Sequence, residues 1–256
     1  MPRFAANLGF LFTEHPFLDR FAAARRAGFR AVEVAQPYDY PPEEIASRLR
    51  DNGLQFILMN LPMGDRAKGD FGIACRPGRE AEFRAGVARG IEYAHAVGVP
   101  KLNCISGTAA EGDDRALYRK TLLSNLRLAA REFKAAGLDL VLEPINTKDV
   151  PGFFVSRSPE AVAIIDEVGA GNLGLQCDLY HTVMMDDDPA AILERCWSAV
   201  RHIQFADAPG RHEPGTGTID FVSLFALIDR LGYEGWVSAE YRPTGPSAES
   251  ISSFMR

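Results

Sequence analysis

Four apolar segments of the chain each end in an acid or an amide: 138-LDLVLEPIN-146, 173-LGLQCDLYH-181, 201-RHIQFADAP-209 and 235-GWVSAEYRP-243. The side chains concerned, Glu143, Asp178, Gln204 and Glu240, are spaced by 35, 26 and 36 residues, about one strand and one helix each time. An ionised group at the end of a buried strand costs several kcal/mol unless something pairs with it. The recurring spacing therefore predicts parallel strands whose polar ends meet around a cation.

Apolar runs of strand length alternate with segments of helical period along the rest of the chain. In 79–97 and 114–136 apolar residues recur every three or four positions, and Gly98 and Gly137 follow as helix C-caps. Ser158, before a proline, is the predicted N-cap of a later helix. Eight strands alternating with helices favour a closed barrel, for which 256 residues is a usual length. We predict an α/β fold, one (β/α)₈ TIM barrel over 1–256, with strands at 4–11, 30–35, 54–60, 101–106, 139–145, 173–179, 200–207 and 235–241.

The composition narrows the class of partner. Lys plus Arg is 28 and Asp plus Glu is 34, which gives a net charge of −6. A negatively charged chain does not favour binding to nucleic acid or to an anionic membrane, so we expect a small-molecule substrate. The N-terminal stretch 1–17 has neither the pattern of a signal peptide nor that of a membrane span. We expect a cytoplasmic protein, and a homo-oligomer is compatible with the sequence.

The four cysteines have no zinc-site spacing and are expected to be buried in a reducing compartment: Cys75, Cys104, Cys177 and Cys196.

The four strand-end residues form a candidate metal site. A single carboxylate such as Glu143 is more often part of a structural ion pair, but four consecutive strands with an oxygen donor at one level favour a shared cation. Hard oxygen donors suit Mg²⁺ or Mn²⁺ better than zinc. The predicted ligands of this divalent metal are Glu143, Asp178, Gln204 and Glu240.

Three further side chains are candidates for binding the substrate. His181 lies three residues beyond Asp178 and would stand just above the metal; a structural histidine is the alternative. Arg211, in the glycine-rich loop 208–219, can hold a substrate carboxylate with its guanidinium, and Arg242 is a second candidate. His202 would lie beneath the metal layer. Loop 208–219 and loop 61–78 are both expected to cover the substrate.

The segments FAANLGFLFTE, EPIN, CDLYH, Q-x-A-D-x-PGRHEPGTG and GW-x-x-x-EYRP resemble the hydroxypyruvate isomerase family of xylose-isomerase-like TIM barrels, over nearly the whole chain. The resemblance implies that Glu143 and Glu240 are the catalytic acid/base pair and that the four strand-end residues hold a divalent metal. Related sugar epimerases carry a histidine at the position of Gln204, so the glutamine agrees with the isomerase branch. The C-terminal SAESISSFMR departs from the glycine-rich stretch typical of the family.

The implied reaction interconverts hydroxypyruvate and 2-hydroxy-3-oxopropanoate (tartronate semialdehyde) by metal-assisted enediol proton transfer between two glutamates. Isomerisation of 2-oxo-tetronate, or of another short sugar or sugar acid, stays open as an alternative. A metal-dependent DNA phosphodiesterase on the same barrel would need a His-rich site and a basic groove, and five histidines with a net charge of −6 argue against it. A barrel that only binds a sugar acid is a third alternative, against which the two glutamates argue.

Overall fold

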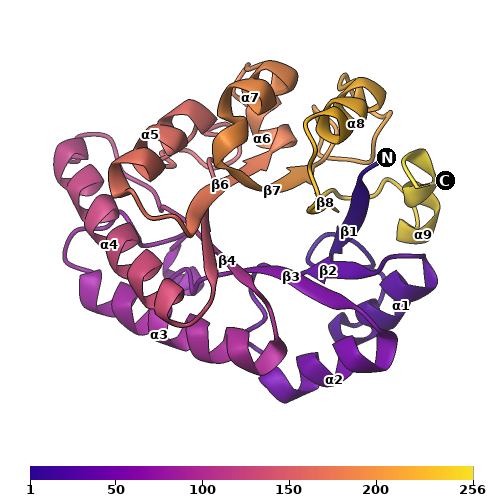
Figure 1. The fold of residues 1–256 in the computed structure, drawn as a ribbon, viewed down its shortest axis with the longest axis horizontal. Helices are drawn as coiled ribbons and strands as arrows, with labels where there is room; N and C mark the ends of the chain where they lie inside the picture. Colours follow the sequence, from indigo (N-terminus) through magenta and orange to yellow (C-terminus); the bar gives the residue numbers. More distant parts are fainter. Residues whose placement is uncertain (256) are drawn as a thin grey trace.

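The computed structural model describes residues 1–255 as a closed barrel of eight parallel strands in the order β1 to β8, surrounded by helices (Figure 1). This confirms the predicted TIM barrel. The strands are β1 (Arg3–Asn7), β2 (Ala31–Glu33), β3 (Gln55–Asn60), β4 (Lys101–Cys104), β5 (Asp139–Leu142), β6 (Leu173–Asp178), β7 (Val200–Phe205) and β8 (Trp236–Ala239). The helices are α1 (Arg20–Arg26), α2 (Pro42–Asn52), α3 (Glu80–Val97), α4 (Arg115–Ala135), α5 (Ser158–Val168), α6 (Leu179–Met184), α7 (Pro189–Cys196), α8 (Phe221–Arg230) and α9 (Ser247–Ser250), with short 3₁₀ turns η1 (Phe17–Asp19), η2 (Arg66–Lys68), η3 (Trp197–Ala199) and η4 (Ile251–Ser253).

The local signals for helix ends hold at most positions. Gly98 and Gly137 have φ of 74° and 71°, the left-handed backbone that a C-cap needs. The prediction of Ser158 as an N-cap is wrong: α5 begins at Ser158, and Arg157 precedes it without a side-chain cap. The first strand ends at Asn7 instead of residue 11, because the Asn7 carbonyl accepts from the amides of two following residues and turns the chain.

The apolar core lies mainly between the strands and the surrounding helices, and a smaller cluster fills the inside of the barrel. That inner cluster consists of Ala5, Ala31, Ile57, Leu58 and Val141, with Trp236 packed against it. The strands also carry buried polar side chains, among them Asn7, Glu33, Gln176, His202 and Gln204. The inside of the barrel can therefore hold a hydrogen-bonded polar layer below its mouth.

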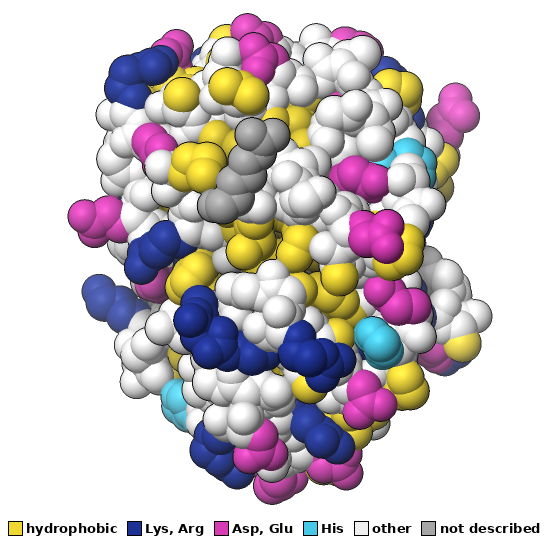
Figure 2. Space-filling model, turned by 90° about the vertical axis from the view of Figure 1, so that its right-hand side faces the viewer, with side chains coloured by type: hydrophobic (Ala, Val, Ile, Leu, Met, Phe, Trp, Pro, Cys, Tyr) yellow, Lys and Arg dark blue, Asp and Glu magenta, His cyan; other side chains and the backbone are white. Residues whose placement is uncertain are grey.

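The C-terminal segment packs against side chains of β1 and β7. The Phe254 ring lies edge-on to Phe4 and Phe205, with centroids 5.0 and 5.1 Å apart. Figure 2 shows this side of the molecule, with α8, α9 and α1 from top to bottom and Lys and Arg side chains mainly in the lower half. Among residues 1–255, no helix combines the length and apolar character needed to cross a membrane.

Candidate active site

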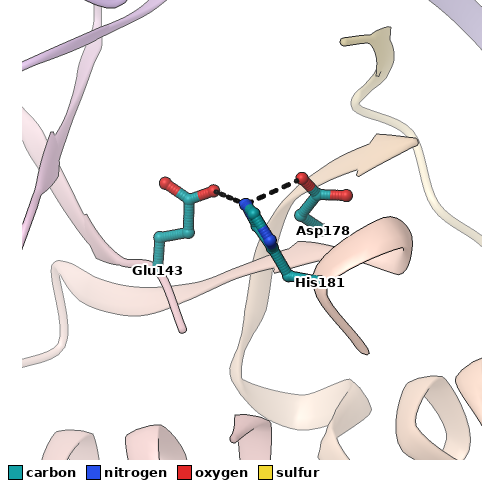
Figure 3. Close-up of side chains that lie close together, drawn as sticks. All are labelled: Glu143, Asp178 and His181. Carbon is teal, nitrogen blue, oxygen red and sulfur yellow. Dashed lines mark ion pairs between the residues drawn. The ribbon is translucent and has the colours of Figure 1, made fainter. Parts of the chain in front are cut away.

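Three carboxylates converge at the carboxyl end of the barrel. Glu143 directly follows β5, Asp178 is the last residue of β6, and Glu240 directly follows β8. Each of the three is at most 8% exposed. Ligand atoms of Glu143, Asp178 and His181 all lie within 4.8 Å of one another, and Figure 3 shows the three side chains pointing toward a common point. The structure thus brings together the strand ends that the sequence singled out.

Burial sets the protonation of these carboxyl groups. It raises the pKa of Glu143 to about 8, and the charge of Asp178 adds to that shift. Burial also raises the pKa of Asp178 and, by a larger amount, that of Glu240, although Arg211 acts in the opposite direction on both. Carboxylates that crowd together out of water become ionised near neutral pH only when a cation is close. The mouth of the barrel is therefore a site that favours positive charge.

The loop after β7 brings that positive charge to the carboxylates, and Asp207 organises the loop. The buried Asp207 carboxylate accepts hydrogen bonds from the amides of Ala208, Gly215, Gly217 and Ile219, at 2.8 to 3.1 Å. A Cβ on Gly217 would lie 2.2 Å from the Ala208 carbonyl oxygen, so this close approach requires glycine. The loop then presents its arginine to the barrel mouth.

Arg211 occupies the centre of the site. Its Nη2 donates to Glu240 Oε2 and lies 3.4 Å from Asp178 Oδ2. The guanidinium carbon is 4.7 Å from the Phe10 ring centroid and 4.8 Å from that of Tyr180, so two aromatic faces flank it. Arg211 itself has a φ of 58°, a left-handed backbone that few non-glycine residues adopt. The backbone of Arg211 is therefore strained, and this strained conformation directs the guanidinium at the carboxylates.

The hydrogen bonds of His181 define its tautomer. Asn146 Oδ1 accepts from the Asp149 amide at 2.7 Å, and Asn146 Nδ2 donates to the Asp149 carboxylate at 3.0 Å, which fixes the amide orientation. The same Nδ2 faces His181 Nδ1 at 2.7 Å, so Nδ1 accepts and the neutral ring carries its proton on Nε2. Burial and the charge of Arg211 lower the pKa of His181 well below its ordinary value. His181 is thus a neutral donor whose Nε2 lies 3.5 Å from Asp178 and 3.8 Å from Glu143.

A buried network beneath the mouth supports Glu240. Glu33, at the end of β2, accepts from Asn7 at 2.9 Å and from Gln204 at 2.5 Å, and its other oxygen lies 2.8 Å from His202 Nε2. The Asn7 and Gln204 amides also reach Glu240 Oε1, at 2.7 and 3.3 Å. Burial alone would raise the pKa of Glu33, but His202 and these amides bring it below its ordinary value. Glu33 is therefore an ionised carboxylate that shares its hydrogen-bond donors with Glu240.

Gln204 lies beside the carboxylates, with its amide nitrogen facing them. Its Oε1 accepts from Gln176 at 2.6 Å, while Gln176 Oε1 is buried without a partner among the described residues. Turning both amides together would preserve the bond between them and direct the Gln204 oxygen toward the cluster. Ligation of a metal by Gln204 requires that turn.

The donor set fits a divalent cation. Glu143, Asp178 and His181 form a buried group that could bind a metal ion, and Glu240 reaches the same cluster through Arg211. The guanidinium shows that the pocket accepts a positive charge beside Asp178 and Glu240. Carboxylate oxygens are ligands that hard divalent cations prefer. Because His181 Nδ1 accepts a hydrogen bond from the Asn146 amide, Nε2 carries the ring proton. Nε2 is therefore better placed to donate to an oxygen than to bind a metal.

Of the remaining predicted residues, Arg242 lies on the rim and His202 beneath the mouth. The exposed Arg242 places its guanidinium 5.7 Å from the Phe10 ring, and its backbone amide donates to the Arg211 carbonyl at 2.8 Å. Four residues of the site were not predicted from the sequence: Asn7, Glu33, Asn146 and Asp207. Glu33 had a detectable signal, a carboxylate inside the apolar run 31-AVEVA-35. The two asparagines gave none.

The chain is similar to known proteins over nearly its whole length. The family described as "Xylose isomerase-like TIM barrel" matches residues 21–256. The chain belongs to this family. The 2-oxo-tetronate isomerase of Cupriavidus necator is 47% identical over 97% of the chain and 96% of its own length. The hydroxypyruvate isomerase of Escherichia coli is 45% identical over 95% of the chain and 94% of its own. The resemblance inferred from the sequence motifs is confirmed.

Solved structures share the fold. A protein described as AP endonuclease, family 2, from Brucella melitensis superimposes with a TM-score of 0.96 at 40% identity, over 99% of this chain and 98% of its own. An L-ribulose 3-epimerase superimposes with a TM-score of 0.78 at 22% identity, over 100% of this chain and 88% of its own. At that identity the second likeness extends to the fold alone.

Proposed function

We propose that this family member is an aldose–ketose isomerase that interconverts hydroxypyruvate and 2-hydroxy-3-oxopropanoate. The observation that carries the proposal is the buried group of Glu143, Asp178 and Glu240 around the guanidinium of Arg211. Relatives at 45 and 47% identity that are named isomerases support it. A four-carbon oxo acid such as 2-oxo-tetronate fits the same chemistry and is the alternative substrate.

The reaction moves one proton between neighbouring carbons. A base takes a proton from C3 of hydroxypyruvate to give an enediol, and an acid returns a proton to C2, while the hydroxyl proton on O3 passes to O2. Glu143 and Glu240 supply the base and the acid, and each reverses its role in the opposite direction. A bound Mg²⁺ or Mn²⁺ would stabilise negative charge on the enediol oxygens. Glu143, Asp178, Gln204 and Glu240 would hold that ion.

The other residues position the substrate. Arg211 binds the carboxylate of the oxo acid through Nη1, because Nε and Nη2 already donate to Glu240 and Asp178 while the guanidinium keeps its positive charge. His181 donates its Nε2 proton to a substrate oxygen, since its pKa and its bond to Asn146 keep it neutral. The aromatic rings of Phe10 and Tyr180 keep Arg211 oriented. Arg242 on the rim contributes little to this binding.

A phosphodiesterase function, which the description of the Brucella protein suggests, has less support in this chain. Binding to a DNA backbone depends on phosphate contacts from Lys and Arg, whereas this chain carries a net charge of −6. The arginine at the centre of the site is also paired with carboxylates and flanked by aromatic rings, an arrangement suited to a small anion.

A substrate panel followed by NMR tests the proposal. Purified protein with Mg²⁺ or Mn²⁺ is incubated with oxo acids and ketoses of three to six carbons, with and without chelator, and products are identified directly. Turnover of hydroxypyruvate above that of ketohexoses, lost with chelator, is expected. Turnover of 2-oxo-tetronate above hydroxypyruvate would select the alternative, and turnover of ketoses alone would contradict an oxo-acid substrate.

A further inference from the structure

A second cavity lies at the opposite, amino-terminal end of the barrel. Its volume is about 690 Å³, within the range of roughly 300–1,000 Å³ that small-molecule sites span. It opens between the C-terminal ends of α2 and α3 and the beginnings of β3, β4 and β8. Nothing in the proposed reaction uses this cavity.

The charged side chains around it are basic. Arg50, His95, Lys101 and His202 line the cavity, and no Asp or Glu is among the described residues of its wall. Helix C-termini carry roughly half a negative charge each, and the two cationic side chains of the wall, Arg50 and Lys101, exceed that contribution. An anion would therefore be attracted to this end of the barrel.

Lys101 is the group best placed to hold such an anion. Its Nζ donates to the carbonyl of Arg201, which uses one of three ammonium donors. No carboxylate among residues 1–255 forms an ion pair with it. Burial lowers the pKa of Lys101, although the charge of Asp139 on the neighbouring strand β5 acts in the opposite direction, and a ligand carrying a negative charge would further stabilise the protonated form.

Part of the cavity wall is apolar. Phe56 and Ile57 of β3 and Trp236 at the start of β8 line the same cavity as Lys101. We propose that this cavity is a second ligand site, which takes a small organic anion with its acidic group on Lys101 and its carbon chain against Ile57 and Trp236. Inorganic anions would lack the apolar contacts and bind more weakly.

The site has a route to the catalytic residues. His202 forms part of the cavity wall, and its Nε2 lies 2.8 Å from Glu33 Oε2. Glu33 in turn shares the amide of Asn7 with Glu240, a link that does not depend on the orientation of the Gln204 amide. A ligand that displaces His202 would move Glu33 and change the support of Glu240. The coupling rests on the proposed isomerase function, whereas binding itself does not.

Tryptophan fluorescence measures the binding directly. The chain has two tryptophans, so Trp197→Phe leaves Trp236 in the cavity wall as the sole reporter. Butyrate is titrated as the probe, 1-butanol is the uncharged control of equal chain length, and inorganic phosphate is the anion without a chain. We expect saturable quenching by butyrate, weaker quenching by phosphate and none by butanol. Equal responses to butyrate and butanol would overturn the proposal.

Three variants locate the response. In the Trp197→Phe background, Lys101→Met should abolish it, Lys101→Arg should retain it, and Lys134→Met, on the exposed face of α4, should leave it unchanged. Circular dichroism confirms folding of each protein. Quenching that survives Lys101→Met in a folded protein would contradict the site.

An isomerase assay with saturating butyrate tests the coupling. Butyrate that competes at Arg211 raises KM alike in wild type and in Lys101→Met. A coupled site predicts an additional change in kcat in wild type that Lys101→Met loses. Identical kcat responses would contradict the coupling, while absence of all turnover would contradict the proposed function and leave the fluorescence result standing.

Discussion

The two ends of this barrel carry side chains of opposite charge. At the mouth, Glu143 and Glu240 directly follow β5 and β8, and burial raises their pKa values. At the base, β4 and β8 begin with Lys101 and Trp236 around a basic cavity. A parallel barrel can thus keep two polar sites apart by placing them at opposite ends of its strands. Between them lies the Glu33–His202 pair. His202 lines the basic cavity, and Glu33 shares the Asn7 donor with Glu240.

The largest expected effect concerns the two glutamates of the mouth. Glu143→Gln and Glu240→Gln should each lower kcat by about 10²- to 10⁴-fold, because each removes a general acid–base group while keeping the shape of the side chain. Initial rates on hydroxypyruvate, with circular dichroism to verify folding, provide the measurement. Near-wild-type turnover in either variant would refute the assignment of two carboxylates to the proton transfer.

Arg211 should affect binding more than turnover. Arg211→Ala is expected to raise KM for hydroxypyruvate by about 10- to 100-fold, since a charge-assisted hydrogen bond to a carboxylate contributes roughly 1.5–3 kcal/mol. Its effect on kcat should be smaller, because the substrate carboxylate lies away from the carbons that exchange the proton. An unchanged KM would remove Arg211 from the substrate pocket.

The raised pKa of Glu143 predicts a pH dependence of stability. Its pKa is higher in the folded protein than in the unfolded chain, so its contribution is present at acidic pH and is lost as pH rises toward about 8. In chelator-treated protein, Tm should fall between pH 5.5 and 8.5 by more in wild type than in Glu143→Gln, which cannot ionise. Parallel Tm profiles for the two proteins would contradict a buried, proton-holding Glu143.

The smallest effect is expected at the rim. Arg242→Ala should change KM for hydroxypyruvate by less than about threefold, because exposed charge interactions contribute roughly 0–1 kcal/mol. It serves as the matched control for Arg211→Ala, since both arginines lie near the Phe10 ring. A larger KM effect at Arg242 than at Arg211 would exchange the roles assigned to the two residues.

The sequence was most informative where strand period and chemistry coincide. The four strand-end residues could be assigned to one end of the barrel because strands and helices alternate along the chain. This alternation makes all strands parallel, so their carboxyl ends meet at the same end: Glu143, Asp178, Gln204 and Glu240. The first strand was predicted too long because a local turn at Asn7 is made by its own hydrogen bonds, which apolarity does not signal. The apolar pattern of the sequence thus predicts where a residue lies in the barrel better than it predicts the residue at which a strand ends.

The partners of the site residues were beyond sequence reasoning. Asn146 determines the tautomer of His181 from another loop, and Glu33 meets His202 across 169 positions of the chain. Such contacts depend on three-dimensional closure of the barrel, and single residues carry no periodic signal for them. The orientation of the Gln204 amide likewise depends on Gln176 of the neighbouring strand.

Metal dependence tests the central claim most directly. Protein stripped with chelator and verified by elemental analysis is assayed for isomerisation and for Tm, then supplemented with Mg²⁺ or Mn²⁺. Stripping should lower both activity and Tm, and either ion should restore both, because an ion bound only by the folded state stabilises it. Full isomerase activity in protein shown to be free of metal would contradict the account of a carboxylate cluster built to hold a divalent cation.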